Sequence, residues 1–135
     1  MLHPDPAQRL PQADDGALML LSKFHQTRIL LLSDLGRPGQ EYLLASGQDL
    51  RADILVTGLP GQAEPVCDAL LEAVQPKVLI VADSEFPATK RASPRLCERL
   101  AARGIPVFYT RKSGAVTISV RPKAWELQTA AGQKL

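Results

Sequence analysis

Short apolar segments recur along the chain, and turns rich in glycine and proline separate them. Some are apolar runs of strand length, and others carry apolar residues at helical spacing. The segments predicted as strands are 17–21, 28–33, 53–57, 77–82, 107–110 and 115–120. The segments predicted as helices are 40–45, 64–74, 93–103 and 122–131.

Turn and capping residues indicate how some of these segments are joined. The short connection through His25 and Gln26 favours an antiparallel hairpin between the first two strands. Ser93 is a natural N-cap for a helix, and Pro94 fits its first turn. Gly114 is expected at the centre of a second hairpin, between the last two strands.

The alternation of strands and helices predicts an α/β fold with some parallel pairing, and the hairpins make the sheet mixed. The runs DILVT and KVLIVA are apolar on both faces, which is typical of strands covered on both sides. The predicted helices are sufficient for one face only. We therefore expect a second copy of the chain, or an N-terminal half domain outside this sequence, to cover the other face.

Composition excludes little beyond this. The 135 residues suit one domain, and sixteen basic residues against fourteen acidic ones give a net charge of +2, too even to indicate nucleic acid or an anionic membrane. Cys67 and Cys97 fall in predicted helices, where buried free thiols are favoured and a disulfide stays open. No apolar run approaches the roughly 20 residues that cross a bilayer, so the chain as given is expected to be soluble.

Several motifs follow one another between Asp14 and Val120, namely DDGALMLL, RILLLSD, ADILVTGLPGQ, PKVLIVA, RASPRLCERL, GIPVFYT and RKSGAVTISV. In this order they resemble the second half of the metallo-β-lactamase domain of ComEC/Rec2-type DNA internalisation proteins. That family has a hairpin ending in Gly-Asp, then stretches close to ADVLKVPHHGS, PKVAIIS, HPSPEVLERL and GIKVYRT. The resemblance covers about four fifths of the chain and implies half of an αββα sandwich with a role in competence.

The departures from the family fall where its metal would bind. Leu59-Pro60-Gly61-Gln62 stands where the family has His-His-Gly-Ser, and Arg91 replaces its next histidine. Asp34 is the one surviving candidate ligand, and His3 and His25 have no ligand partner at a recognisable spacing. A hydrolytic zinc site needs about three protein ligands. The resemblance therefore implies a module without metal, cofactor or catalytic residues.

Basic residues near the third helix offer a weaker candidate site. Lys90, Arg91 and Arg95 can form a basic edge for the phosphates of DNA. Glu85 and Glu98 lie close in sequence, so an ordinary mixed surface is the favoured interpretation.

The sequence thus predicts three parts: an arm or linker over 1–13, the half domain over 14–121, and a C-terminal helix and tail over 122–135. Two alternatives stay open. One is a metal-dependent phosphoesterase or nuclease completed by a partner chain. The other is a receiver-like regulatory domain, although Thr57 stands where its phosphate-accepting aspartate would be. The residues leave the compartment open; the resemblance implies an extracytoplasmic domain, tied to a membrane only through a larger parent protein.

Overall fold

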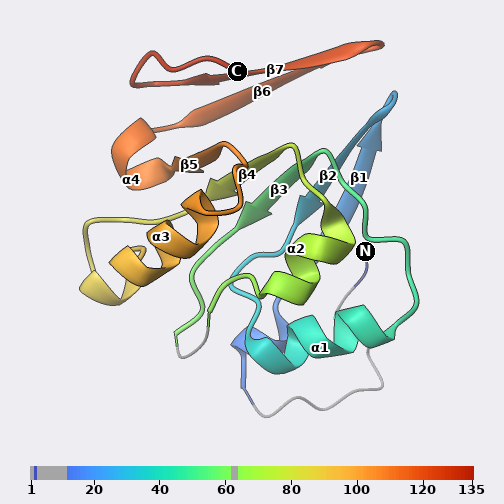
Figure 1. The fold of residues 1–135 in the computed structure, drawn as a ribbon, viewed down its shortest axis with the longest axis vertical. Helices are drawn as coiled ribbons and strands as arrows, with labels where there is room; N and C mark the ends of the chain where they lie inside the picture. Colours follow the sequence, from blue (N-terminus) through green and yellow to red (C-terminus); the bar gives the residue numbers. More distant parts are fainter. Residues whose placement is uncertain (1, 3–11, 62–63) are drawn as a thin grey trace.

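A mixed five-stranded sheet forms the centre of the molecule in the computed structural model, which describes residue 2 and residues 12–61 and 64–135 (Figure 1). The strands lie in the order β1-β2-β3-β4-β5; β1 is antiparallel to β2, and β2 to β5 are parallel. Their bounds are Leu20–Phe24, Thr27–Leu31, Ile54–Thr57, Val78–Val81 and Val107–Tyr109. The predicted hairpin through His25 and Gln26 is confirmed, and the arm predicted over 1–13 lies almost wholly outside the described residues.

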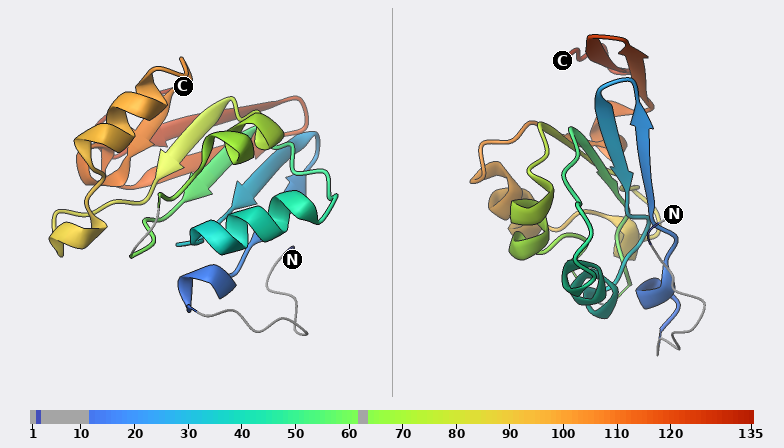
Figure 2. Two further views of the ribbon diagram at one scale, coloured as in Figure 1. Left: turned by 60° about the horizontal axis from the view of Figure 1, so that its bottom comes forward. Right: turned by 90° about the vertical axis from the view of Figure 1, so that its right-hand side faces the viewer.

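Three helices cover one face of this sheet, as Figure 2 shows from two sides. They are α1 (Arg37–Ala45), α2 (Asp68–Val74) and α3 (Pro94–Ala101). Their apolar residues, such as Leu43, Leu70 and Leu100, form the larger core cluster with one face of the strands. The predicted fold class, an α/β mixed sheet with helices on one face, is confirmed. Two 3-10 turns, η1 (Asp14–Gly16) and η2 (Ala88–Lys90), lie in the loops.

Capping explains where two of these helices begin. The Ser93 hydroxyl accepts a hydrogen bond from the Leu96 amide at 3.1 Å, which confirms the predicted N-cap of α3. Helix α2 begins four residues later than predicted. The buried Gln40 side chain donates to the Glu64 carbonyl and accepts from the Cys67 amide, both at 2.8 Å. These bonds hold the chain before Asp68 out of the helix.

A two-stranded antiparallel sheet packs on the opposite face and corrects two predictions. It consists of β6 (Val116–Arg121) and β7 (Ala124–Thr129). The helix predicted over 122–131 is wrong, because this segment contains strand β7. The hairpin predicted around Gly114 is also wrong. A short helical turn, α4 (Thr110–Ser113), follows β5, and β6 pairs with β7 and not with β5.

The second sheet has a small core of its own. Ile54, Val78, Ile80 and Phe108 on the back of the main sheet pack with Leu127 of β7, and Trp125 lies at the edge of this cluster. The chain therefore covers part of the face that was expected to be bare. The part that the described residues leave open lies over β1 and β2, where Leu18 and Phe24 are 50% and 54% exposed.

Cys67 is buried, Cys97 is half-buried, and both thiols are free. Among the described residues, no helix combines the length and the apolar character needed to span a membrane.

Candidate functional site

The carboxyl ends of the parallel strands bring the predicted site residues to one edge of the sheet. Ligands of open α/β sheets bind at this edge where the strand order reverses and helices pass to the other face. Here the strand order follows the sequence and the three connecting helices share one face, so no reversal opens a crevice. Any ligand site at this edge must be built by loop residues.

Asp34 lies just after β2 and is neutralised by a lysine from a distant loop. The Lys90 ammonium is 2.7 Å from Asp34 Oδ2 and donates a second hydrogen bond to the Leu59 carbonyl oxygen, also at 2.7 Å. Gly58 lies so close to the Asp34 carboxylate that a Cβ atom there would overlap it. The cationic group beside Asp34 is therefore an ammonium held by the protein itself.

The side chains at this edge do not fit the metal that the resemblance implies. Among residues 12–61 and 64–135, no group of three His, Cys, Asp or Glu side chains is placed to hold an ion. Leu59 and Pro60 offer no side-chain ligand. Asp34 is paired with Lys90, and Asp14 Oδ2 accepts a hydrogen bond from the Gly61 amide at 2.7 Å. A zinc-dependent hydrolase needs three protein ligands and an open position for water.

The basic edge predicted from Lys90, Arg91 and Arg95 does not form a continuous cationic surface. Lys90 is bound by Asp34, and Arg91 contacts Glu85 Oε1 at 2.7 Å. Arg95 is exposed on α3 and has no ion pair among the described residues. Two of the three predicted phosphate-binding side chains, Lys90 and Arg91, are thus paired with carboxylates, and this pairing weakens their attraction for phosphates.

Asp83 is a buried carboxylate at this edge that sequence reasoning missed. Its side chain is fully inaccessible and accepts hydrogen bonds from the Arg111 amide at 2.9 Å and from the Ala92 amide at 3.4 Å. The Arg111 guanidinium lies over it and also contacts Glu85. This network fixes the loop after β4 against the end of β5. A sequence signal for it is hard to find, because Asp83 and Arg111 are 28 residues apart.

Tyr109, the last residue of the edge strand β5, lies beside Cys97 of α3. They line a hollow of about 420 Å³ together with Ala101 and Ile105. Burial raises the pKa of Tyr109 above its usual range, and the Cys97 side chain next to it raises that pKa further. The phenol therefore stays protonated at neutral pH and is unsuited to act as a base.

A shallow apolar groove of about 400 Å³ lies on the open part of the sheet, above the carboxyl ends of β2 and β3. Leu18, Leu20, Leu31 and Val56 line it, and Asp34 stands at its end. The groove is the part of the sheet that neither the helices nor the β6–β7 hairpin covers. Leu18 at its border is 50% exposed, so part of this apolar surface is open to solvent.

Neither a scan against models of known protein families nor a search among curated proteins finds a match for this chain. The resemblance to the ComEC/Rec2 family therefore rests on the sequence motifs alone.

Proposed function

We propose that this chain is a non-catalytic, metal-free module of the ComEC/Rec2-like β-lactamase type that takes part in DNA uptake by binding. The order of its motifs supports the family, and the mixed sheet with helices on one face is compatible with half of an αββα sandwich. The link to competence comes from the resemblance alone.

One observation carries the non-catalytic part of the proposal. The Lys90 ammonium stands between Asp34 and the Leu59 carbonyl, at 2.7 Å from each. Asp34 is the surviving candidate ligand, and Leu59 begins the loop that corresponds to the family's histidine pair. A second cation beside this ammonium is electrostatically unfavourable. The arrangement thus satisfies the aspartate without a metal.

Metal content and hydrolysis test this proposal together. Purified protein is incubated with Zn²⁺ or Mn²⁺, dialysed, and measured by mass spectrometry for bound metal. It is also assayed with bis(p-nitrophenyl) phosphate and with single-stranded DNA. We expect less than about one tenth of a metal ion per chain and no hydrolysis above buffer, because the ligand set is too small. Stoichiometric metal together with hydrolysis would overturn the proposal.

The variant Lys90→Ala sharpens the test because it frees Asp34. If the lysine alone excludes a metal, this variant binds zinc while the wild type does not. We expect neither to bind, because the histidines of the family are absent at residues 59 and 60. Zinc uptake by the variant would show that Lys90 keeps a metal away from Asp34 and would contradict the expectation that the ligand set is too small.

The receiver-like alternative is not proposed. Receiver domains have the strand order 2-1-3-4-5 with a parallel sheet wound on both faces. This chain has the order β1-β2-β3-β4-β5, begins with an antiparallel hairpin, and carries α1, α2 and α3 on one face.

A partner over the open part of the sheet belongs to the proposal. The groove lined by Leu18, Leu20 and Leu31 is apolar, and β1 next to it is the terminal strand of the five-stranded sheet. We propose that a second copy of the chain covers this surface; a preceding half domain in a longer protein would use the same residues.

A further inference from the structure

The outer edge of β5 lies at the end of the main sheet opposite the groove over β1 and β2. Strand β5 is the last in the sheet order, and among the described strands it pairs with β4 alone. The Leu79 amide donates to the Pro106 carbonyl at 3.0 Å, so the backbone of Pro106 faces β4. Backbone groups alternate in direction along a strand. Those of Phe108 therefore also face β4, and those of Val107 and Tyr109 face the outer edge.

The outward backbone groups of β5 have no strand beside them. Among the described residues, no hydrogen bond from outside the β4–β5 pair reaches the Val107 amide, the Val107 carbonyl or the Tyr109 amide. An unpaired strand edge is a template for another strand, and proteins bind extended peptides by adding them to such an edge. Because β5 has only three residues, the edge suits a short peptide segment.

The hollow of about 420 Å³ next to β5 lies on the helix side of this edge. The side chains of Val107 and Tyr109 pack with the core on the helix side, whereas Phe108 packs with the core behind the sheet. Cys97 and Ala101 of α3 form the facing wall. A strand added to β5 would send every second side chain into this hollow, between the edge and α3. The lining favours an aliphatic side chain there.

The end of the hollow beyond β5 carries an unpaired positive charge. Lys112 of α4 lines the hollow, and its ammonium is 6.0 Å from the centre of the Tyr109 ring. Lys112 is exposed and forms no ion pair among the described residues. Asp83 is close enough to raise the pKa of Tyr109, but its carboxylate is held by Arg111. Lys112 is therefore available for a carboxylate of a bound peptide.

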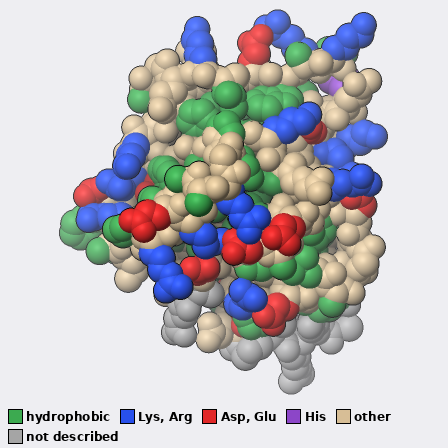
Figure 3. Space-filling model, viewed as in Figure 1, with side chains coloured by type: hydrophobic (Ala, Val, Ile, Leu, Met, Phe, Trp, Pro, Cys, Tyr) green, Lys and Arg blue, Asp and Glu red, His purple; other side chains and the backbone are tan. Residues whose placement is uncertain are grey.

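Apolar and basic side chains meet at the surface of this region. On the face drawn in Figure 3, hydrophobic side chains reach the surface over the end of α3, and Lys and Arg side chains lie at the margin beside α4. A peptide that combines an aliphatic side chain with a carboxylate matches both features.

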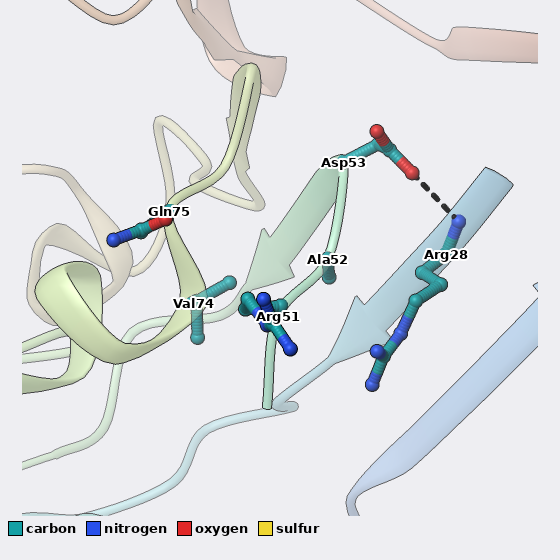
Figure 4. Close-up of a pocket in the computed structure, with 6 residues that line it drawn as sticks. All are labelled: Arg28, Arg51, Ala52, Asp53, Val74 and Gln75. Atoms are coloured by element: carbon teal, nitrogen blue, oxygen red, sulfur yellow. Dashed lines mark hydrogen bonds between the residues drawn. The ribbon is translucent and has the colours of Figure 1, made fainter. Parts of the chain in front are cut away.

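The groove at the amino ends of β2 and β3 lacks this combination (Figure 4). It has a volume of about 280 Å³, and Arg28 and Arg51 line it. Both guanidinium groups pair with Asp49, at 2.6 Å and 3.1 Å. Strands β2 and β3 each have a strand on both sides, so the groove offers no strand edge for pairing. The edge of β5 is therefore the better peptide site.

We infer that the outer edge of β5 binds an extended peptide segment of another protein, which joins the sheet as an additional antiparallel strand. One peptide residue forms both hydrogen bonds with Val107, and the residue two positions earlier in the peptide accepts from the Tyr109 amide. The side chains of these two residues enter the hollow. An acidic residue two positions earlier again lies beyond Tyr109 and contacts Lys112.

A second copy of β5 fits this edge less well. Antiparallel pairing centred on Phe108 would place residues 103–105 of the copy opposite Lys112, and this segment carries Arg103 and no carboxylate. The site also lies away from the groove proposed for a second copy and needs no metal. The metal, hydrolysis and dimer tests therefore address different claims.

Titration of ¹⁵N-labelled protein with synthetic peptides, followed by NMR, tests the site. The probe is Asp-Thr-Val-Thr-Val-Thr-Thr, acetylated and amidated so that the aspartate is its only charge, and its control has asparagine in place of aspartate. The probe should shift the Val107 and Tyr109 amide signals and bind with a Kd below about 1 mM. The control should bind at least about five-fold more weakly. The absence of saturable shifts at β5, or equal affinity of the two peptides, would overturn the inference.

The charge contact is assigned with Lys112→Ala. This variant should bind the aspartate probe no more tightly than the asparagine control, while its affinity for the control stays as in the wild type. Arg95→Ala is the matched variant, because Arg95 is exposed on α3 and does not line the hollow. Arg95→Ala should change the affinity for the probe by less than about two-fold. Equal losses in the two variants would mean that the aspartate does not bind at Lys112, contrary to the inference.

Removal of one backbone donor tests the strand pairing itself. Val107→Pro deletes an amide that faces away from β4, a position where an edge strand accepts proline. Val107→Ala is the control, because it shortens the same side chain and keeps the amide. The proline variant should bind the probe at least about five-fold more weakly than the alanine variant. Circular dichroism checks that both variants fold.

A modified probe repeats this test on the unaltered protein. Methyl groups on the amide nitrogens of both valines remove the peptide donor that faces the Val107 carbonyl, so the affinity should fall at least about five-fold. If methylation leaves the affinity unchanged, the peptide does not pair with β5 and the inference fails.

The hollow is tested with two exposed alanines at the end of α3. Ala101 lines the hollow and Ala102 does not. Ala101→Phe should weaken binding of the probe because the larger side chain occupies the hollow, whereas Ala102→Phe should change affinity by less than about two-fold. Equal affinities of these two variants would show that the valines do not enter the hollow and would contradict the inferred site.

Discussion

At the scale of single residues, a close contact between Gly58 and Asp34 shapes the edge of the sheet at the carboxyl ends of the parallel strands. A Cβ atom at Gly58 would overlap the Asp34 carboxylate, and the Gly58 amide donates to the Ser33 carbonyl at 2.8 Å. The sequence predicted that Asp34 ends the β2 segment, but it did not predict Lys90 as its partner. The two residues are 56 positions apart, and only the folded loops bring them together.

The variant Gly58→Ala should move Asp34 away from Lys90 and lower the free energy of unfolding by about 1–3 kcal/mol, as overpacking does. Urea denaturation followed by circular dichroism measures the change. Gly61→Ala is the matched control, because a Cβ atom there meets only Asp14 Oδ2 at 3.5 Å, an ordinary contact. Equal losses in the two variants would show that the contact with Asp34 is unimportant.

Three carboxyl groups link stability to pH. The hydrogen bonds from Arg28 and Arg99 lower the pKa values of Asp49 and Asp68. Partial burial opposes a lower pKa at Asp53, but the hydrogen bonds from Lys77 and the Arg28 amide outweigh it. In the folded state these three carboxyl groups therefore stay ionised down to a lower pH than in the unfolded chain.

The stability that these groups provide is complete above their usual pKa of 3.8 and is lost as the pH falls through the lower folded values. Urea midpoints measured from about pH 6 down to about pH 2 should therefore fall mainly below about pH 4. In the variant Asp53→Asn the urea midpoint should fall less between about pH 4 and about pH 2 than in the wild type. An identical pH profile in the variant would contradict a role for Asp53.

At the scale of elements, the C-terminal hairpin departs most from the sequence-based prediction. Residues 122–131 contain good helix formers, which favoured a helix. The same segment alternates, however: Trp125, Leu127 and Thr129 point inward, and the residues between them are exposed. This period of two was available in the sequence. Packing against the back of the main sheet then outweighed helix propensity.

Leu127 is the residue that anchors this hairpin, with 1% of its surface exposed. Leu127→Ala should lower the free energy of unfolding by about 2–5 kcal/mol, because it leaves a cavity in the second core. The exposed neighbour Gln128→Ala should change it by less than about 0.5 kcal/mol. Chemical denaturation of both variants gives the comparison, and a small loss for Leu127→Ala would mean that the hairpin is only loosely attached.

At the scale of the whole molecule, the fold class was predictable and the second layer was not. The apolar runs of β3 and β4 predicted that both faces of these strands are covered, and this prediction is confirmed. The chain itself supplies much of the second cover through β6 and β7. Strand patterns in a sequence do not say which sheet a strand joins, so β6 was assigned to the wrong layer.

The uncovered part over β1 and β2 leads to a prediction about assembly. If a second copy covers the groove, sedimentation equilibrium at micromolar concentration should show a dimer, and Leu18→Asp should shift it to monomer. Leu135→Asp is a fair control, because Leu135 is 47% exposed, close to the 50% of Leu18. A monomeric wild type would contradict the prediction for a second copy.

Lys23 and Lys123 are exposed at the tips of the β1–β2 and β6–β7 hairpins and have no ion-pair partner among the described residues, so positive charge is more prominent at this end of the molecule than the net charge of +2 suggests. In the field of an anionic surface such a molecule rotates before it touches, and presents its hairpin tips first. Orientation by a field raises the rate of encounter and fades as salt shortens the reach of the field. The speed of association with any polyanion should therefore depend on ionic strength more steeply than a uniformly charged protein of this size would show.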